Sequence, residues 1–262
     1  MDKSLLLPRE KYAEVYEKYS RGPSMFEIEN DKQLFFYFGA NHSRNPADPQ
    51  YPALREYWHR FLKETEGKDR IVLIEGSLRP VEKDEETAIT NGGSEGGFIT
   101  FLARKAGVPI ACPDLSDEEL IKLLPYQDKN EVLLYWFLSW LNNFQKHAEP
   151  KPDFEKSAKI WCERQKKKQM WKDIDISLPR LKELYKQILG KDFNEKENPN
   201  NLVNPNLTDT KINKIARAQS DLRDYKIASE IERYWNEGKN IFVVFGQGHL
   251  IIQEPALRAV LR

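Results

Sequence analysis

The sequence predicts an α/β protein with a central, largely parallel sheet flanked by helices and a long helical insertion before the last strand. Three observations predict this fold. Four short apolar runs are typical of strands buried on both faces, helical patterns separate the first three runs, and the region from about 131 to 238 contains no convincing strand. We expect one α/β domain over residues 1–262, with 131–238 as a helical insertion within it.

The strand-like runs are short, rich in aromatic or β-branched residues, and each is followed by a polar, turn-like cluster. They cover residues 34–38, 71–74, 108–112 and 241–245. Such near-continuous apolar runs are typical of strands that are covered by helices on both sides. We expect the buried core of the sheet to contain Phe35, Tyr37, Val72, Ile74, Ile110, Phe242 and Val244.

Helical periodicity fills the segments between these strands. Residues 51–65 place their large apolar side chains on one helical face, and Ser94 precedes a second helical segment that ends near Gly107. Ser116 opens a third helix with a capping-box pattern, and residues 208–237 form one long helical pattern. The alternation of strand and helix predicts right-handed crossovers and parallel pairing.

Composition excludes several classes of protein. Forty-one Lys and Arg residues balance 41 Asp and Glu residues, so a general nucleic-acid binder is not expected, and the lysines at 166–168 are interpreted as a solvated helix face. Two cysteines give neither a disulfide framework nor a cysteine zinc site. We find no signal segment or membrane span, and therefore expect a cytoplasmic protein without a membrane partner.

Four chemically reactive side chains follow the four predicted strands, namely His42, Glu75, Asp114 and His249. The carboxyl ends of parallel strands share one edge of a sheet, where ligands bind in open α/β folds. Two of these ends repeat one motif, Gly-x-x-His, at 39–42 and 246–249. Glycine permits a sharp exit from the strand, and histidine is suited to proton transfer or metal binding.

These paired motifs resemble the TraB/Tiki-like and erythromycin-esterase/ChaN-like superfamily. The strand-end Glu75, the early helical Glu95 and the Arg223-containing segment at 223–228 are also similar to the family, and the resemblance spans about 34–261. It implies an α/β core with an active cleft between two halves. Some members resemble metal-dependent peptidases, some are metal-free esterases that use His and Glu, and some bind haem. The chain departs from exported or membrane-tethered members because it shows no signal or anchor.

We expect His42, Glu75, His249 and Arg223 to be catalytic, and Glu95, Asp114 and Asp224 to bind a ligand. A divalent transition metal is a possible cofactor, held by His42, His249 and Glu75, with haem as the alternative. Each residue also has a structural interpretation: a strand-end charge for Glu75, a favourable N-terminal carboxylate for Glu95, a helix cap for Asp114, and an ordinary ion pair between Arg223 and Asp221 or Asp224. His59 and His147 are interpreted as structural.

Three functions remain open from the sequence. The first is a hydrolase that uses paired His and Glu to activate water, with or without a metal, on an ester, amide or peptide bond of a small molecule or peptide. The second is a protein that binds haem or a small anionic ligand on the same scaffold. The third is a non-catalytic module that presents the helices of 131–238 to a partner. The hydrolase and the ligand-binding function both require the rings of His42 and His249 to converge. The oligomeric state is left open.

Overall fold

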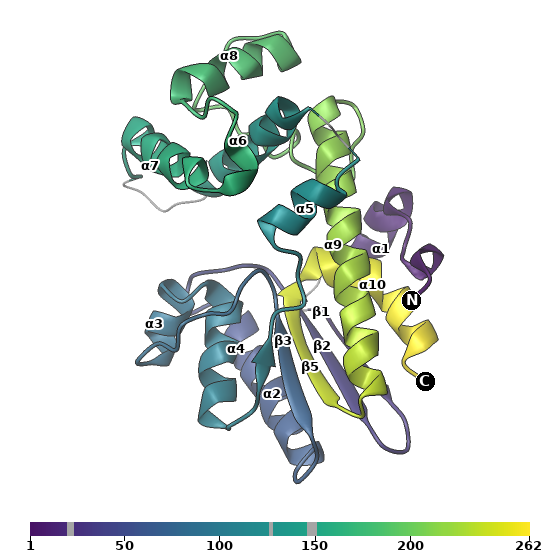
Figure 1. Cartoon of the computed structure of the whole chain (residues 1–262). Coiled ribbons are helices and arrows are strands. Elements are labelled where there is room, and N and C mark those ends of the chain that lie inside the picture. Colours follow the sequence, from purple (N-terminus) through teal and green to yellow (C-terminus); the bar gives the residue numbers. More distant parts are fainter. Residues whose placement is uncertain (20–23, 126–127, 146–150) are drawn as a thin grey trace. The chain divides into compact units, whose positions relative to one another are not determined.

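The computed structural model describes residues 1–19, 24–125, 128–145 and 151–262, and Figure 1 shows its elements. The chain is an α/β protein with a five-stranded, mostly parallel sheet, which confirms the predicted fold class. Its contacts divide it into two compact units. The sheet unit comprises Met1–Ser116 and Arg223–Arg262, and the helical unit comprises Asp117–Leu222. The segment at 223–238, which the sequence assigned to the insertion, therefore belongs to the sheet unit.

The sheet has the strand order β1-β2-β5-β3-β4. Its parallel strands are β2 (Leu34–Ala40), β5 (Asn240–Gly246), β3 (Arg70–Ile74) and β4 (Ile110–Ala111). The sequence analysis missed β1 (Ser24–Glu29), which pairs antiparallel with β2. Its side chains mostly alternate between buried and exposed, as expected for an edge strand. The search for continuous apolar runs therefore passed over it.

The fourth strand is shorter than the sequence predicts. Only Ile110 and Ala111 pair with β3, and they form the edge of the sheet opposite β1. Ile110 is partly buried, so its assignment to the buried core was wrong. The reason is its edge position, where no further strand covers it. The other six residues expected in the core are buried.

Helices cover both faces of the sheet, and strand alternation decides which side chains meet which layer. Phe36 and Phe38 pack with α2 (Gln50–Glu64), α3 (Glu85–Thr90) and α4 (Ser94–Lys105). Phe35 and Tyr37 face the opposite layer. That layer comprises the carboxyl-terminal part of α9 (Lys211–Asn236), α10 (Gln247–Val260) and the N-terminal η1 (Lys3–Leu5), η2 (Arg9–Lys11) and α1 (Tyr12–Tyr19).

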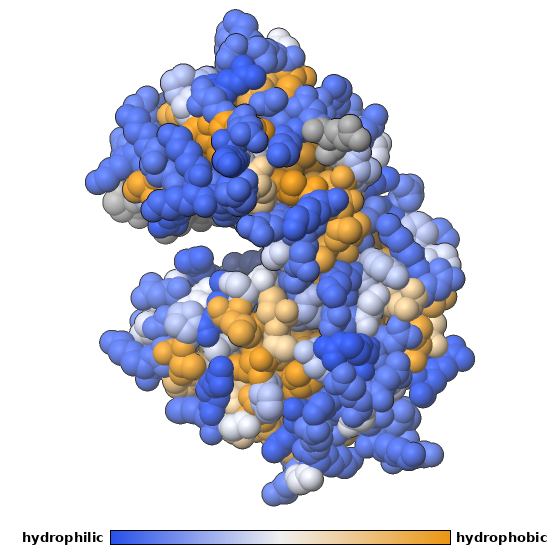
Figure 2. Space-filling model, viewed as in Figure 1, coloured by the Kyte–Doolittle hydropathy of each residue, from blue (hydrophilic) through white to orange (hydrophobic). Residues whose placement is uncertain are grey.

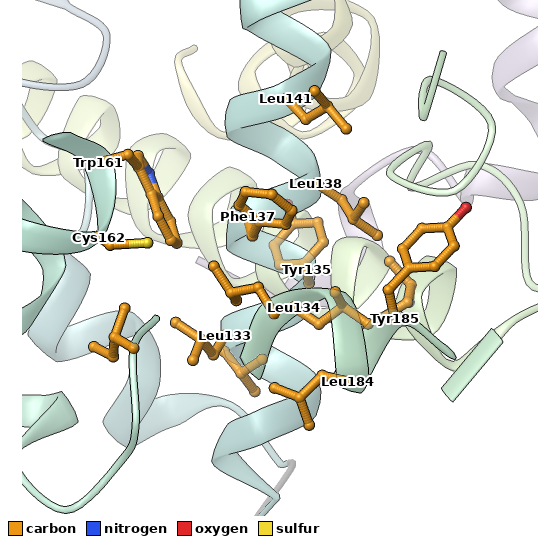
Figure 3. Close-up of a cluster of buried hydrophobic side chains, with 14 of the residues drawn as sticks. Leu133, Leu134, Tyr135, Phe137, Leu138, Leu141, Trp161, Cys162, Leu184 and Tyr185 are labelled. Atoms are coloured by element: carbon orange, nitrogen blue, oxygen red, sulfur yellow. The ribbon is translucent and has the colours of Figure 1, made fainter. Parts of the chain in front are cut away.

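The helical unit has a core of its own, shown in Figure 3. The apolar run that includes Leu133, Leu134, Phe137 and Leu138 lies on one helix and is buried in this core. Its described elements are α5 (Asp117–Leu123), α6 (Lys129–Gln145), α7 (Phe154–Lys166), η3 (Gln169–Trp171), α8 (Leu178–Leu189) and the first part of α9.

The viewed surface is mostly hydrophilic, with apolar residues in small groups (Figure 2). Across the described residues, no helix is both long enough and apolar enough to cross a bilayer.

Two neighbouring glycines of α4 provide a test of the packing between α3 and α4. A Cβ at Gly97 would lie 2.2 Å from the Ala88 carbonyl oxygen and 2.6 Å from the Gly92 backbone, whereas a Cβ at Gly96 would lie 3.7 Å from its nearest neighbour. Backbone atoms cannot rotate away, so Gly97→Ala is expected to lower the free energy of unfolding by roughly 1–3 kcal/mol. Gly96→Ala should be neutral or stabilising by up to about 1 kcal/mol. Urea unfolding measures both, and equal effects would contradict the packing.

Candidate functional site

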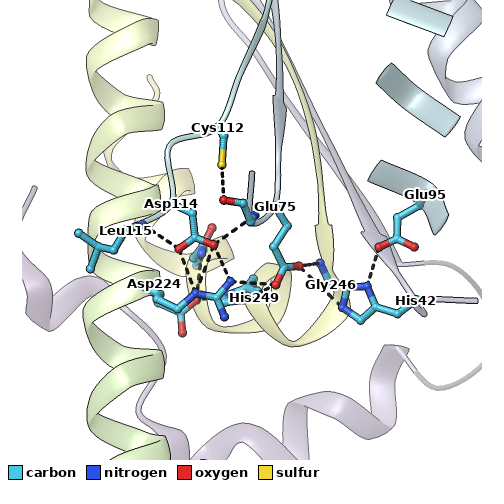
Figure 4. Close-up of polar contacts among 12 residues, drawn as sticks. His42, Glu75, Glu95, Cys112, Asp114, Leu115, Asp224, Gly246 and His249 are labelled. Carbon is cyan, nitrogen blue, oxygen red and sulfur yellow. Dashed lines mark hydrogen bonds and ion pairs between the residues drawn. The ribbon is translucent and has the colours of Figure 1, made fainter. Parts of the chain in front are cut away.

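The predicted site residues gather at the carboxyl edge of the parallel strands (Figure 4). His42 lies two residues beyond β2, Glu75 directly follows β3, and His249 lies in the first turn of α10, which begins where β5 ends. The neighbours β2 and β3 flank β5, so the three side chains start from adjacent strands. This is the edge at which open α/β sheets bind ligands.

The Glu75 carboxylate stands between the two histidines. Its Oε2 lies 3.7 Å from His42 Nε2, and its Oε1 lies 3.4 Å from His249 Nε2. The Gly246 amide donates a 2.9 Å hydrogen bond to Oε2, and Arg223 Nη2 donates one of 2.9 Å to Oε1. The predicted convergence of the two Gly-x-x-His motifs is therefore present, with Glu75 between them.

Each imidazole also contacts a second carboxylate, through its Nδ1 atom. His42 Nδ1 lies 2.5 Å from Glu95 Oε1, and His249 Nδ1 lies 2.6 Å from Asp224 Oδ1. A carboxylate at Nδ1 places a proton there and fixes the orientation of the ring. In both histidines, the Nε2 atom is therefore the one that faces Glu75.

Asp114 and Arg223 form the next pair. Arg223 donates from Nε and Nη2 to the Asp114 carboxylate at distances of 2.6 to 3.2 Å. The Gly76 amide also donates to Asp114, at 3.3 Å. Asp114 is almost fully buried, so its charge requires this partner. The alternative expected from the sequence, in which Arg223 pairs with Asp224, does not match these contacts, because Asp224 binds His249 instead.

Two polar partners were missed by the sequence analysis. Arg9, from η2, donates a 2.6 Å hydrogen bond to Asp224 Oδ2, and Gln253 donates one of 2.9 Å to Asp224 Oδ1. Gln253 lies one helical turn after His249 on α10, and this i, i+4 spacing was a usable signal. Arg9 carried no such signal, because nothing in the sequence links the N-terminal segment to α9.

The glycine of each motif leaves space for residues at or near the other motif. A Cβ at Gly246 would lie 2.5 Å from His42 Nε2, and a Cβ at Gly39 would lie 3.0 Å from the Leu250 side chain and 3.2 Å from the Gln247 Cα. Both glycines thus permit close approach. His42 itself adopts a left-handed backbone conformation, with φ of 54°. The two motifs form one sterically interlocked unit.

The charged groups of the site shift one another's pKa values. Burial opposes protonation of His249, but the charges of Asp224 and Glu75 outweigh it and raise the pKa of His249 to about 9. Burial alone would raise the pKa of Glu75, yet His249, Arg223 and His42 hold that pKa well below its usual value. Partial desolvation works against protonation of His42, but its hydrogen bond to Glu95 raises the pKa above 6.5.

The donor set was compared with the cofactors that the resemblance implies. His42, His249 and Glu75 are a chemically suitable set of three ligands for a first-row metal. However, both Glu75 oxygens already accept hydrogen bonds, and His249 carries the proton that a ligand must lose. Within the described residues, no three His, Cys, Asp or Glu side chains are arranged to hold an ion. Of the two imidazoles, that of His249 is mostly buried with its Nε2 against Glu75, so only the more exposed His42 could present a nitrogen to a haem iron.

All seven residues predicted for the site therefore lie in one network: His42, Glu75, Glu95, Asp114, Arg223, Asp224 and His249. His59 is exposed on α2 and takes no part in it. His147 lies outside the described residues.

Comparisons with protein-family models, with curated proteins and with solved structures found no match to this chain.

The raised pKa of His249 predicts a pH dependence of stability. The folded-state pKa of about 9 exceeds the usual 6.5, so its contribution is complete below pH 6.5 and is lost as pH rises through 9. For this buried ring, that contribution is on the order of 3 kcal/mol. Urea unfolding from pH 6 to 10 should show the decline. His249→Gln should flatten the curve, whereas His59→Gln should follow the parent chain. An unchanged slope in His249→Gln would contradict the assignment.

The close approach at Gly246 predicts a selective effect on His42. Ala fits the backbone at this position, where φ is −55°, but its methyl group would displace the His42 ring. We expect Gly246→Ala to return the His42 pKa toward 6.5, because the displaced ring loses its hydrogen bond to Glu95. Gly248→Ala is the matched control, since its Cβ would lie 3.6 Å from the nearest atom. NMR titration of the histidines measures the His42 pKa in both variants. An unaltered His42 titration in Gly246→Ala would contradict the close contact between Gly246 and His42.

Proposed function

We propose that this chain is a hydrolase of an ester, amide or peptide bond, with His42 as the general base. The observation that carries the proposal is the different exposure of two similarly held imidazoles. The His42 side chain is 55% exposed, whereas that of His249 is 12% exposed. With its Nδ1 proton directed to Glu95, neutral His42 offers its Nε2 lone pair to a water molecule on the accessible side of the site.

The reaction follows from these positions. His42 Nε2 takes a proton from water as the water oxygen attacks the substrate carbonyl carbon, and the carbonyl oxygen becomes an oxyanion. The intermediate then collapses, and the proton on His42 passes to the departing alcohol or amine. Arg223 Nη1 makes no hydrogen bond with any described residue, so it is available to the oxyanion.

The remaining charged groups of the site position His42 and Arg223. Glu75 remains ionised beside His42 and favours the imidazolium that forms there. Protonated His249 and Arg223 bind the Glu75 carboxylate from the other side and fix its orientation. The resemblance to the TraB/Tiki-like and erythromycin-esterase/ChaN-like superfamily agrees with this use of His and Glu. No step of the proposed reaction requires a metal.

Hydrolysis of a panel of p-nitrophenyl esters and p-nitroanilides tests the proposal. His42→Gln is expected to lower kcat by roughly 10²–10⁴-fold, because it removes the general base. His59→Gln should retain the parent rate. The rate should rise with pH as His42 loses its proton and fall near pH 9 as His249 loses its own. A chelator should leave the rate unchanged. Equal rates in His42→Gln and the parent chain would overturn the assignment, and inhibition by the chelator would replace it with a metal-dependent one.

A further inference from the structure

Arg79 is a cation of the sheet unit that has no hydrogen-bond or ion-pair partner among the described residues. Its guanidinium makes no hydrogen bond or ion pair with any described residue, and its Nε atom is buried. A buried N–H without an acceptor costs free energy, so such an atom indicates a missing partner. The other two arginines of this region are engaged, because Arg9 pairs with Asp224 and Arg223 with Glu75 and Asp114.

Its distances from three glycines show that this guanidinium lies beside the site. A Cβ at Gly93 would lie 3.2 Å from Arg79 Cζ, one at Gly76 would lie 3.4 Å from Nη2, and one at Gly96 would lie 3.7 Å from Nε. Gly76 directly follows Glu75, and Gly96 directly follows Glu95. Arg79 therefore lies against the backbone that carries the two glutamates flanking His42.

The carboxylates of the network have partners other than Arg79. Glu75 and Asp114 bind Arg223, Asp224 binds Arg9 and His249, and Glu95 binds His42. Glu95 Oε2 lacks a hydrogen-bond partner among the described residues, but no ion pair joins it to Arg79. The guanidinium of Arg79 is therefore unpaired among the described residues, and its planar fork matches a carboxylate or a phosphate.

We infer that Arg79 binds an oxyanion group, a carboxylate or a phosphate, on the substrate of the site. This inference rests on the proposed hydrolase function and specifies its substrate class: an ester or amide that carries a negative charge close to the bond that is cleaved. Arg79 is partly exposed, so such a group reaches it from solvent. The role of Arg79 is recognition, and the proton transfers remain with His42.

Binding is measured first, without any turnover. Isothermal titration calorimetry at constant ionic strength would compare inorganic phosphate, succinate and the uncharged succinamide. The parent chain is expected to bind at least one of the two anions and not succinamide. Arg79→Gln should weaken that binding roughly tenfold or more, as expected for the loss of a charge-assisted hydrogen bond. Arg104→Gln is the matched control, because Arg104 is an exposed arginine in the last turn of α4.

Turnover is measured second, with the neutral p-nitrophenyl butyrate and the anionic mono-p-nitrophenyl succinate. Arg79→Gln should raise KM for the anionic ester roughly tenfold or more and leave kcat/KM for the neutral ester unchanged. Anion binding that depends on Arg79 without hydrolysis of either ester would overturn the hydrolase proposal while the anion contact stands. Equal binding in parent and Arg79→Gln, or no binding of either anion, would overturn the role of Arg79. The comparison of phosphate with succinate decides which oxyanion the site prefers.

Discussion

The organisation of the sheet edge depends on one partly buried acid, Glu75. Its carboxylate contacts His42, Arg223, and both His249 and the Gly246 amide of the second motif, which come from three separate parts of the chain. A carboxylate with so little exposure stays ionised only where cations and N–H donors surround it. The strand order supplies this condition, because β3, β5 and β2 deliver the acid and both histidines from adjacent positions.

From Glu75 the charges continue as an alternating series. On one side, His42 leads to Glu95, and on the other side, His249 leads to Asp224 and then to Arg9. Each group in this series faces a group of opposite sign. Removing one member leaves its neighbour buried and unpaired, which costs more than the pair itself contributes. Only the His42 end of the series is widely open to solvent, and this asymmetry distinguishes two histidines that are otherwise held alike.

Sequence reasoning found this site because four of its residues follow strands of a parallel sheet, whose carboxyl ends must share an edge. His42, Glu75, Asp114 and His249 could be grouped on that ground alone, before any coordinates. Arg9 and Arg79 could not, because Arg9 lies in a short 3-10 helix and Arg79 in a loop, and both reach the site through the fold of the whole sheet unit. The edge strand β1 was missed for a related reason, since its alternating pattern differs from the continuous runs of the buried strands.

Because α9 carries Arg223 and Asp224 as consecutive residues, a change in the length of this helix would misdirect both side chains. Successive helical positions differ by about 100° around the axis, so one residue turns to Asp114 and Glu75 while the next turns to His249 and Arg9. Insertion of a single residue within α9 just before this pair would turn both side chains by about 100°, so that Arg223 would take the direction of Asp224 and Asp224 would turn away from His249. The loop at 194–206 has no such phase to keep, and length variation among related chains should therefore collect there rather than in α9.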